Sequence, residues 1–130
     1  MKTSINLSIL FLLFTLLIGR SVLAQETRLL RNPDISQDKI TFVYAGDIWL
    51  ADVDGSEVKR ITAFKGVESD PHFSPDGQSI AFTGQYDGNT DVYVVPVEGG
   101  EPKRLTWHPG ADLVRGWSQD GTVVIFASGR

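Results

Sequence analysis

The chain contains no cysteine and only two histidines, His72 and His108, among its 130 residues. Without cysteine there is no disulfide framework, no thiolate metal site and no cysteine nucleophile. Basic residues are fewer than acidic ones: the sequence has 12 lysines and arginines and 16 acids, which gives a formal net charge of −4. This balance argues against a nucleic-acid partner, which would attract a basic surface. The length predicts one ordinary domain at most.

The sequence also lacks an apolar run long enough to span a bilayer. Its longest run, from Ile5 to Ile18, falls short of the roughly 20 residues that a membrane helix needs. Lys2 precedes this run, and Val22 and Ala24 form an A-x-A-like cleavage site before Gln25. Residues 1–24 are therefore predicted to be a signal peptide of an exported protein, periplasmic or secreted. An uncleaved membrane anchor and a buried helix are the alternatives.

Cleavage would leave a more acidic chain without a stable membrane span. It would remove Lys2 and Arg20 from the 12 basic residues and none of the 16 acids, so the net charge would fall from −4 to −6.

What the sequence does contain is an internal repeat. When the chain is shifted by 44 positions, residues 47–84 align with 91–128 without a gap, and 12 of the 38 aligned pairs are identical. A weaker copy precedes them, because "PDIS" at 33–36 matches "PHFS" at 71–74 and "ITF" at 40–42 matches "IAF" at 80–82. A repeat of about 40 to 45 residues with several strands in each unit is typical of a β-propeller blade.

Each repeat contains turn and strand signals in the same order. Ser74-Pro75-Asp76-Gly77 has the residues of a type I turn, with glycine accepting a positive φ at the last position. Its copy at 118–121 replaces the proline by glutamine. Strands are predicted at 47–51, 59–62, 78–83, 91–95, 103–106 and 122–127, with short strands at "DPHF" and "VRGW" and hairpin turns at 54–55 and 98–100.

The predicted fold class is all-β, a β-propeller of blades with four antiparallel strands each. The blades are expected at 30–66, 67–110 and, incomplete, 111–130, so residues 25–130 would form about two and a half blades of a partial N-terminal propeller. Propellers usually close with roughly 4 to 8 blades, and the chain therefore resembles the start of a longer protein. Phe42, Phe82 and Phe126 are expected in equivalent positions between neighbouring blades, as are Trp49 and Tyr93.

The order of motifs resembles a known family. "NPDIS", "ITFVYAGDIW" and "RIT", followed by "PHFSPDGQSIAF", are similar to the opening of the tricorn protease family and its bacterial tricorn-like relatives. The resemblance implies a six-bladed N-terminal propeller, a second propeller, a PDZ-like domain and a serine peptidase core whose catalytic residues lie far towards the C-terminus. No catalytic residue can be carried over. The blade pattern alone also resembles TolB-type propellers and those of prolyl oligopeptidase relatives.

Direct evidence for chemistry in this segment is weak. A serine triad needs a nucleophile beside a base, and no G-x-S-x-G motif accompanies His72 or His108, which are expected in surface or loop packing. The oxygen-rich stretch 87–91, "DGNTD", suggests a calcium loop, but it lacks the glycine and closing glutamate and is better explained as a polar hairpin. We therefore predict no catalytic residue, no cofactor-binding residue and no metal-binding residue in this sequence.

The Lys-Arg pairs at 59–60 and 103–104 occupy the same position in two repeats. Solubility of an outer strand explains them, and an anionic partner is the alternative.

The function predicted from this sequence is a non-catalytic propeller segment of an exported tricorn-like serine peptidase, serving as scaffold and peptide-access filter. Its partners would be peptides or unfolded proteins and the remaining domains of the parent peptidase, with a homo-oligomer left open. The alternative is a TolB-like periplasmic interaction propeller without peptidase activity. A third class is an enzyme whose active site lies inside the propeller tunnel.

Export makes the first testable prediction. If residues 1–24 are cleaved, N-terminal mass spectrometry of protein from the envelope or the medium should find a chain that begins at Gln25, in part cyclised. An intact segment from Met1 to Ala24 in the exported pool would contradict cleavage.

Overall fold

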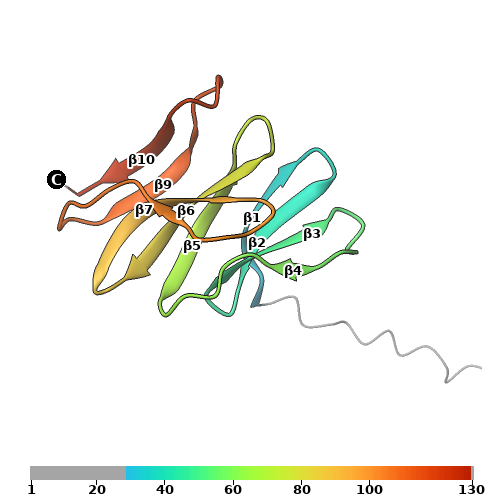
Figure 1. The fold of residues 1–130 in the computed structure, drawn as a ribbon, viewed down its shortest axis with the longest axis horizontal. Helices are drawn as coiled ribbons and strands as arrows, with labels where there is room; N and C mark the ends of the chain where they lie inside the picture. Colours follow the sequence, from blue (N-terminus) through green and yellow to red (C-terminus); the bar gives the residue numbers. More distant parts are fainter. Residues whose placement is uncertain (1–28, 130) are drawn as a thin grey trace, which may run out of the picture.

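The computed structural model describes residues 29–129 as three antiparallel β-sheets that stand side by side (Figure 1). The predicted signal peptide lies outside these residues. The described residues contain no α-helix, and no helix among them is long and apolar enough to cross a membrane. The all-β fold of four-stranded blades is confirmed, and the row of sheets does not close into a ring.

The first two sheets each contain four strands in chain order, and the third contains two. Sheet one is β1 (Arg31–Ser36), β2 (Lys39–Tyr44), β3 (Asp47–Asp52) and β4 (Lys59–Arg60); sheet two is β5 (Val67–Phe73), β6 (Ser79–Tyr86), β7 (Asn89–Pro96) and β8 (Lys103–Arg104); sheet three is β9 (Asp112–Trp117) and β10 (Val124–Ser128). Within each of the first two sheets the chain therefore runs from an inner strand to an outer one, and it then crosses to the next sheet.

The turn that begins each main repeat has the predicted geometry. The Gly77 amide donates to the Ser74 carbonyl over 2.8 Å, and the Gly121 amide donates to the Ser118 carbonyl over 2.9 Å. Both glycines have a φ of 71°, which is the left-handed region that glycine adopts without strain. In both turns the serine hydroxyl donates to the aspartate carboxylate over 2.6 Å, which lowers the pKa of Asp76 and Asp120.

The weaker first copy uses a shorter turn. Ser36 pairs with Lys39, and Gln37 adopts a φ of 54° where the later copies have glycine. The sequence signal was faint here because a two-residue turn needs no Pro-Asp-Gly.

The outer strands are shorter than predicted, with two paired residues each instead of four. After Arg60 the chain continues along β3, but the Thr62 hydroxyl accepts the Ile48 amide hydrogen over 2.9 Å. The Thr106 hydroxyl accepts the Val92 amide in the same way over 3.0 Å. The Ile61 and Leu105 amides still donate to the Ile48 and Val92 carbonyls over 2.8 Å, so a side chain replaces only the backbone acceptor at the end of each outer strand.

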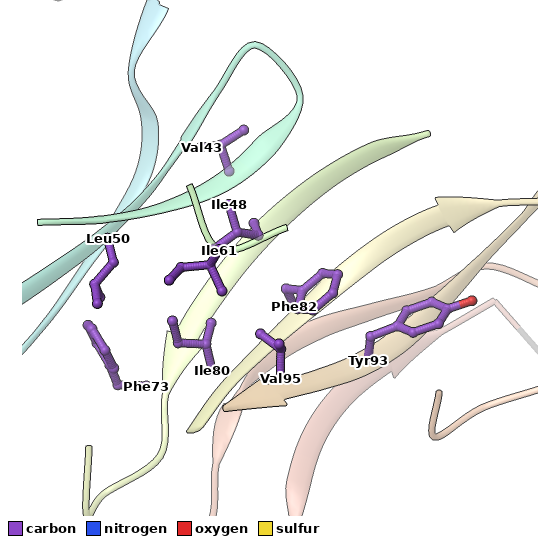
Figure 2. Close-up of a cluster of buried hydrophobic side chains, with 9 residues drawn as sticks. All are labelled: Val43, Ile48, Leu50, Ile61, Phe73, Ile80, Phe82, Tyr93 and Val95. Atoms are coloured by element: carbon purple, nitrogen blue, oxygen red, sulfur yellow. The ribbon is translucent and has the colours of Figure 1, made fainter. Parts of the chain in front are cut away.

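The main core lies between sheets one and two. Figure 2 shows Val43, Ile48, Leu50 and Ile61 of the first sheet facing Phe73, Ile80, Phe82, Tyr93 and Val95 of the second. Phe82 is 0% exposed and stacks on Tyr93 with the ring centroids 5.7 Å apart. A smaller cluster of Ala81, Val92 and Val114 joins sheets two and three.

Of the five aromatic residues predicted between blades, only Phe82 and Tyr93 are enclosed in the described residues. Phe42 lines a groove of about 440 Å³ on the side of sheet one that faces away from sheet two. Trp49 packs edge-on against Tyr44 and donates its indole hydrogen to the Tyr44 carbonyl. Phe126 is 36% exposed, because sheet three contains only β9 and β10 among the described residues.

The buried position of Phe82 predicts a large effect of truncation. Phe82→Ala should lower the free energy of unfolding by roughly 3 to 5 kcal/mol, the usual loss for a core phenylalanine. Gln85→Ala, on the exposed end of the same strand, is the matched control and should cost little. Denaturant titration of both variants measures the difference, and equal losses would contradict the inward-facing assignment.

The uncovered groove makes a third prediction. Its walls are apolar side chains that include Ile40, Phe42, Val53 and Val58, and such a face is a template for association. A purified fragment of residues 25–130 should therefore self-associate or fold only in part, as measured by light scattering. A monodisperse monomer that melts cooperatively would contradict the incomplete propeller.

Candidate functional site

The inner strands β1, β5 and β9 lie next to one another, so that their edges form one continuous surface. Side chains connect each inner strand to the following one. The Asp34 carboxylate accepts the Phe73 amide hydrogen over 2.8 Å, and the Trp117 indole donates to the His72 carbonyl over 2.9 Å. Because the innermost strands of a propeller surround its central channel, this surface is the candidate functional site.

The same irregularity interrupts all three inner strands. Strand pairing shifts register between Arg31 and Asp34, between Ser69 and His72, and opposite Ile125 and Phe126. Asn32 and Asp70, at the first two bulges, have φ values of 49° and 50°, and the Asn32 amide donates to the Asp70 carboxylate over 3.1 Å. Such bulges bend a strand and redirect its side chains, which here brings Asn32 of β1 and Asp70 of β5 into contact.

His72 lies on this inner surface, but its surroundings do not resemble a catalytic triad. Its Nδ1 atom is 3.9 Å from the Asp34 carboxylate, which forms an ion pair when the imidazole is protonated. The same carboxylate oxygen already accepts the Phe73 amide, so Asp34 holds β1 against β5. No hydroxyl nucleophile of the described residues is hydrogen-bonded to His72.

His108 lies in the loop between β8 and β9, ahead of the inner strand and not on it. Its Nδ1 atom accepts the Gly110 amide hydrogen over 2.9 Å, and its carbonyl accepts a hydrogen bond from the Asn89 side chain over 2.8 Å. These contacts join the β6–β7 hairpin to the loop that leads into sheet three. The structure does not bring His72 and His108 together in one contact.

The oxygen-rich stretch 87–91 forms a tight hairpin. Asp87 and Gly88 have φ values of 52° and 82°, and Tyr86 pairs with Asn89 across the turn. The Asp91 carboxylate is directed into the blade, where Arg104 and Thr106 donate to it over 2.6 Å and 3.2 Å. Among residues 29–129 no three histidine or acidic side chains cluster as metal ligands would.

The Lys-Arg pairs divide into two roles. Arg60 donates to Asp47 over 2.9 Å and to the Thr62 carbonyl over 2.8 Å. Arg104 repeats both contacts with Asp91 and the Thr106 carbonyl, and it lies over the Trp107 ring with 6.0 Å to the centroid. The arginine therefore clamps the outer strand to its neighbour, whereas Lys59 forms an exposed ion pair of 3.7 Å with Glu98.

Sequence reasoning missed a buried carboxylate between the first two sheets. Glu68 of β5 is 1% exposed and accepts the Ile48 amide hydrogen over 3.0 Å. The hydroxyls of Thr62 and Tyr86 also donate to this carboxylate. Burial raises the pKa of Glu68, although the three hydrogen bonds oppose the rise. The one available signal was the alignment of Glu68 with Asp112, which places an acid at the same step of two repeats and buries both.

A second hollow lies at the rim where these residues reach the surface. It has a volume of about 400 Å³ and combines aromatic with charged walls, among them Phe64, Lys65, Tyr86 and Arg104. The Phe64 and Tyr86 rings are 5.8 Å apart, and Tyr86 meets Tyr93 at 4.7 Å. Because Tyr86 is anchored by Glu68, the aromatic wall of this hollow depends on the buried carboxylate.

Known proteins share both the sequence and the arrangement of sheets. The family described as the tricorn protease N-terminal beta propeller domain matches residues 27–130. A "Putative tricorn protease homolog 2" of Streptomyces coelicolor is 44% identical over 55 residues, and the "Tricorn protease" of Thermoplasma acidophilum is 42% identical over 53 residues. These alignments cover 42% and 41% of this chain but only 5% of either relative.

Solved structures agree with the sequence matches. The crystal structure of the tricorn protease aligns with a TM-score of 0.66 and 33% identity, over 75% of this chain and 10% of that one. A putative TolB from Agrobacterium tumefaciens aligns with a TM-score of 0.63 and 28% identity, over 70% of this chain and 34% of that one. The family match extends over all of the described residues, and the chain belongs to the tricorn protease N-terminal beta propeller domain family.

Proposed function

We propose that this chain is a non-catalytic propeller segment of an exported tricorn-like serine peptidase, in which it acts as scaffold and peptide-access filter. The observation that carries the proposal is the shared inner edge of β1, β5 and β9, with the same bulge in each strand and polar side chains at the bulges, Asn32, Asp70 and Arg115. An edge of this kind can contact an extended peptide without holding a nucleophile and base together.

The contacts of the candidate catalytic groups support a structural role. Asp34 joins β1 to β5, His108 joins a hairpin to a loop, and Asp91 holds Arg104 inside its blade. The small share of each relative that the chain spans also supports the proposal, because it leaves room for the second propeller, the PDZ-like domain and the peptidase core that the family resemblance implies.

The TolB likeness supports one alternative, an interaction propeller without peptidase activity. The intact mass of the native protein distinguishes the two. A protein large enough to hold a peptidase core supports the first proposal, and a single closed propeller supports the second.

A pair of substitutions at His72 tests the filter in the intact peptidase. His72→Trp adds bulk at the inner edge and should slow the hydrolysis of long peptides several-fold more than that of tripeptide amides. His72→Ala removes the imidazole without adding bulk and should leave the tripeptide rate within about twofold of the wild type. His108→Trp, in an exposed loop, is the matched control and should change neither rate.

Two results would overturn parts of this proposal. Loss of all hydrolysis in His72→Ala would assign His72 to catalysis. Equal slowing of long and short substrates in His72→Trp would show that the inner edge does not select peptides by length.

A further inference from the structure

The interface between the first two sheets contains a carboxylate without a cationic partner among the described residues. Glu68 lies at the start of β5, and its carboxylate reaches across to sheet one. The donors to it are neutral: the Ile48 amide and the Thr62 hydroxyl from sheet one, and the Tyr86 hydroxyl from β6. A buried charge held only by neutral donors is disfavoured relative to its protonated form.

From this geometry we propose that Glu68 is a proton-responsive latch, which binds the first two blades more tightly when its carboxyl is protonated. Oε2 accepts from the Ile48 amide and from Thr62, and Oε1 accepts from Tyr86. The two contacts of Oε2 remain possible in both states if the proton resides on Oε1. The neutral carboxyl then donates to the Tyr86 oxygen, so that the Glu68–Tyr86 contact persists with its direction reversed while the buried charge disappears.

The neighbouring charged groups favour the same direction. Asp47 of β3 raises the pKa of Glu68 further, and the Arg60 guanidinium on β4 is engaged with Asp47 rather than with Glu68. Tyr86 and Tyr93, on β6 and β7, both have a raised pKa because they are buried, so they stay neutral wherever Glu68 titrates. Lys65, in the loop before β5, is exposed to solvent.

The sign of the effect follows from linkage. The pKa of Glu68 in the folded state lies above the ordinary value of 4.5, so the folded state binds the proton more tightly than the unfolded state. The contribution of protonated Glu68 is complete below the ordinary pKa and is lost as the pH rises through the folded value. Across that window, opening of the interface becomes more favourable by up to tenfold per pH unit.

Amide-resolved hydrogen exchange of the intact protein, expressed in its own host, tests the latch. The Ile48 amide reports on it directly because it donates to Glu68. After correction for intrinsic exchange, protection of Ile48 should fall as the pH rises through the window. The Val114 amide, which donates to the Thr83 hydroxyl over 2.9 Å, is the internal control and should not follow this profile.

Three variants make the assignment specific. Glu68→Gln keeps the shape and the hydrogen-bonding capacity without a titratable proton, and it should flatten the Ile48 profile. Glu57→Gln makes the same change at an exposed site and should keep the wild-type profile. Tyr86→Phe removes one donor to the ionised carboxylate, so the fall in protection should continue to higher pH.

Clear outcomes would overturn the latch. An unchanged Ile48 profile in Glu68→Gln, or protection that rises with pH in the wild type, contradicts it. If Glu68→Gln fails to fold, Tyr86→Phe decides, because a profile identical to that of the wild type would show that the proton does not reside at the Glu68–Tyr86 contact.

Discussion

The whole arrangement depends on one constraint: the sheets are apolar on both faces, so each must be covered on both sides. Phe82 and Ile80 project from one face of β6 into the first core, while Ala81 projects from the other face into the second. A strand with apolar side chains on both faces of its sheet cannot bury all of them against a single neighbouring sheet. Stacking of similar sheets is the arrangement that meets this demand with a repeated sequence, and it turns the inner edges towards a common line.

Within each blade, the polar residues perform a separate task. The clamp of aspartate, arginine and threonine closes the outer strand onto its neighbour, and it recurs with nearly the same distances in sheets one and two. Its members come from a single repeat, so each blade completes its own clamp. Glu68 and Asp34 work differently, because each accepts a backbone hydrogen from the adjacent sheet. Blade closure and blade-to-blade attachment are thus carried by different side chains.

The repeat made most of the fold predictable from sequence. Spacing of 44 residues, Ser-x-Asp-Gly turns and apolar strands were sufficient for the strand order, for the turn geometry at Gly77 and Gly121, and for burial of Phe82. The environments of Phe42 and Phe126 could not be read in the same way, because burial depends on a neighbouring sheet or strand and not on the residue itself. Likewise, the role of Arg60 was hidden, since a Lys-Arg pair looks the same whether its arginine faces solvent or Asp47. Glu68 was missed because its donors come from β3, from β6 and from the segment after β4, which the sequence does not place together.

The glycines of the repeated turns have a geometric consequence beyond φ. A Cβ atom on Gly77 would lie 3.0 Å from the Ser36 hydroxyl of the preceding turn, and one on Gly121 would lie 3.4 Å from the Pro75 ring. At the opposite rim, the Glu68 amide donates to the Gly46 carbonyl over 2.8 Å, which fixes the approach of the same two sheets. Together these contacts limit how closely successive blades approach one another at their two ends. Since the number of blades that a ring can hold is a full circle divided by the angle between neighbours, a bulkier residue at either glycine would change the ring that such blades could form.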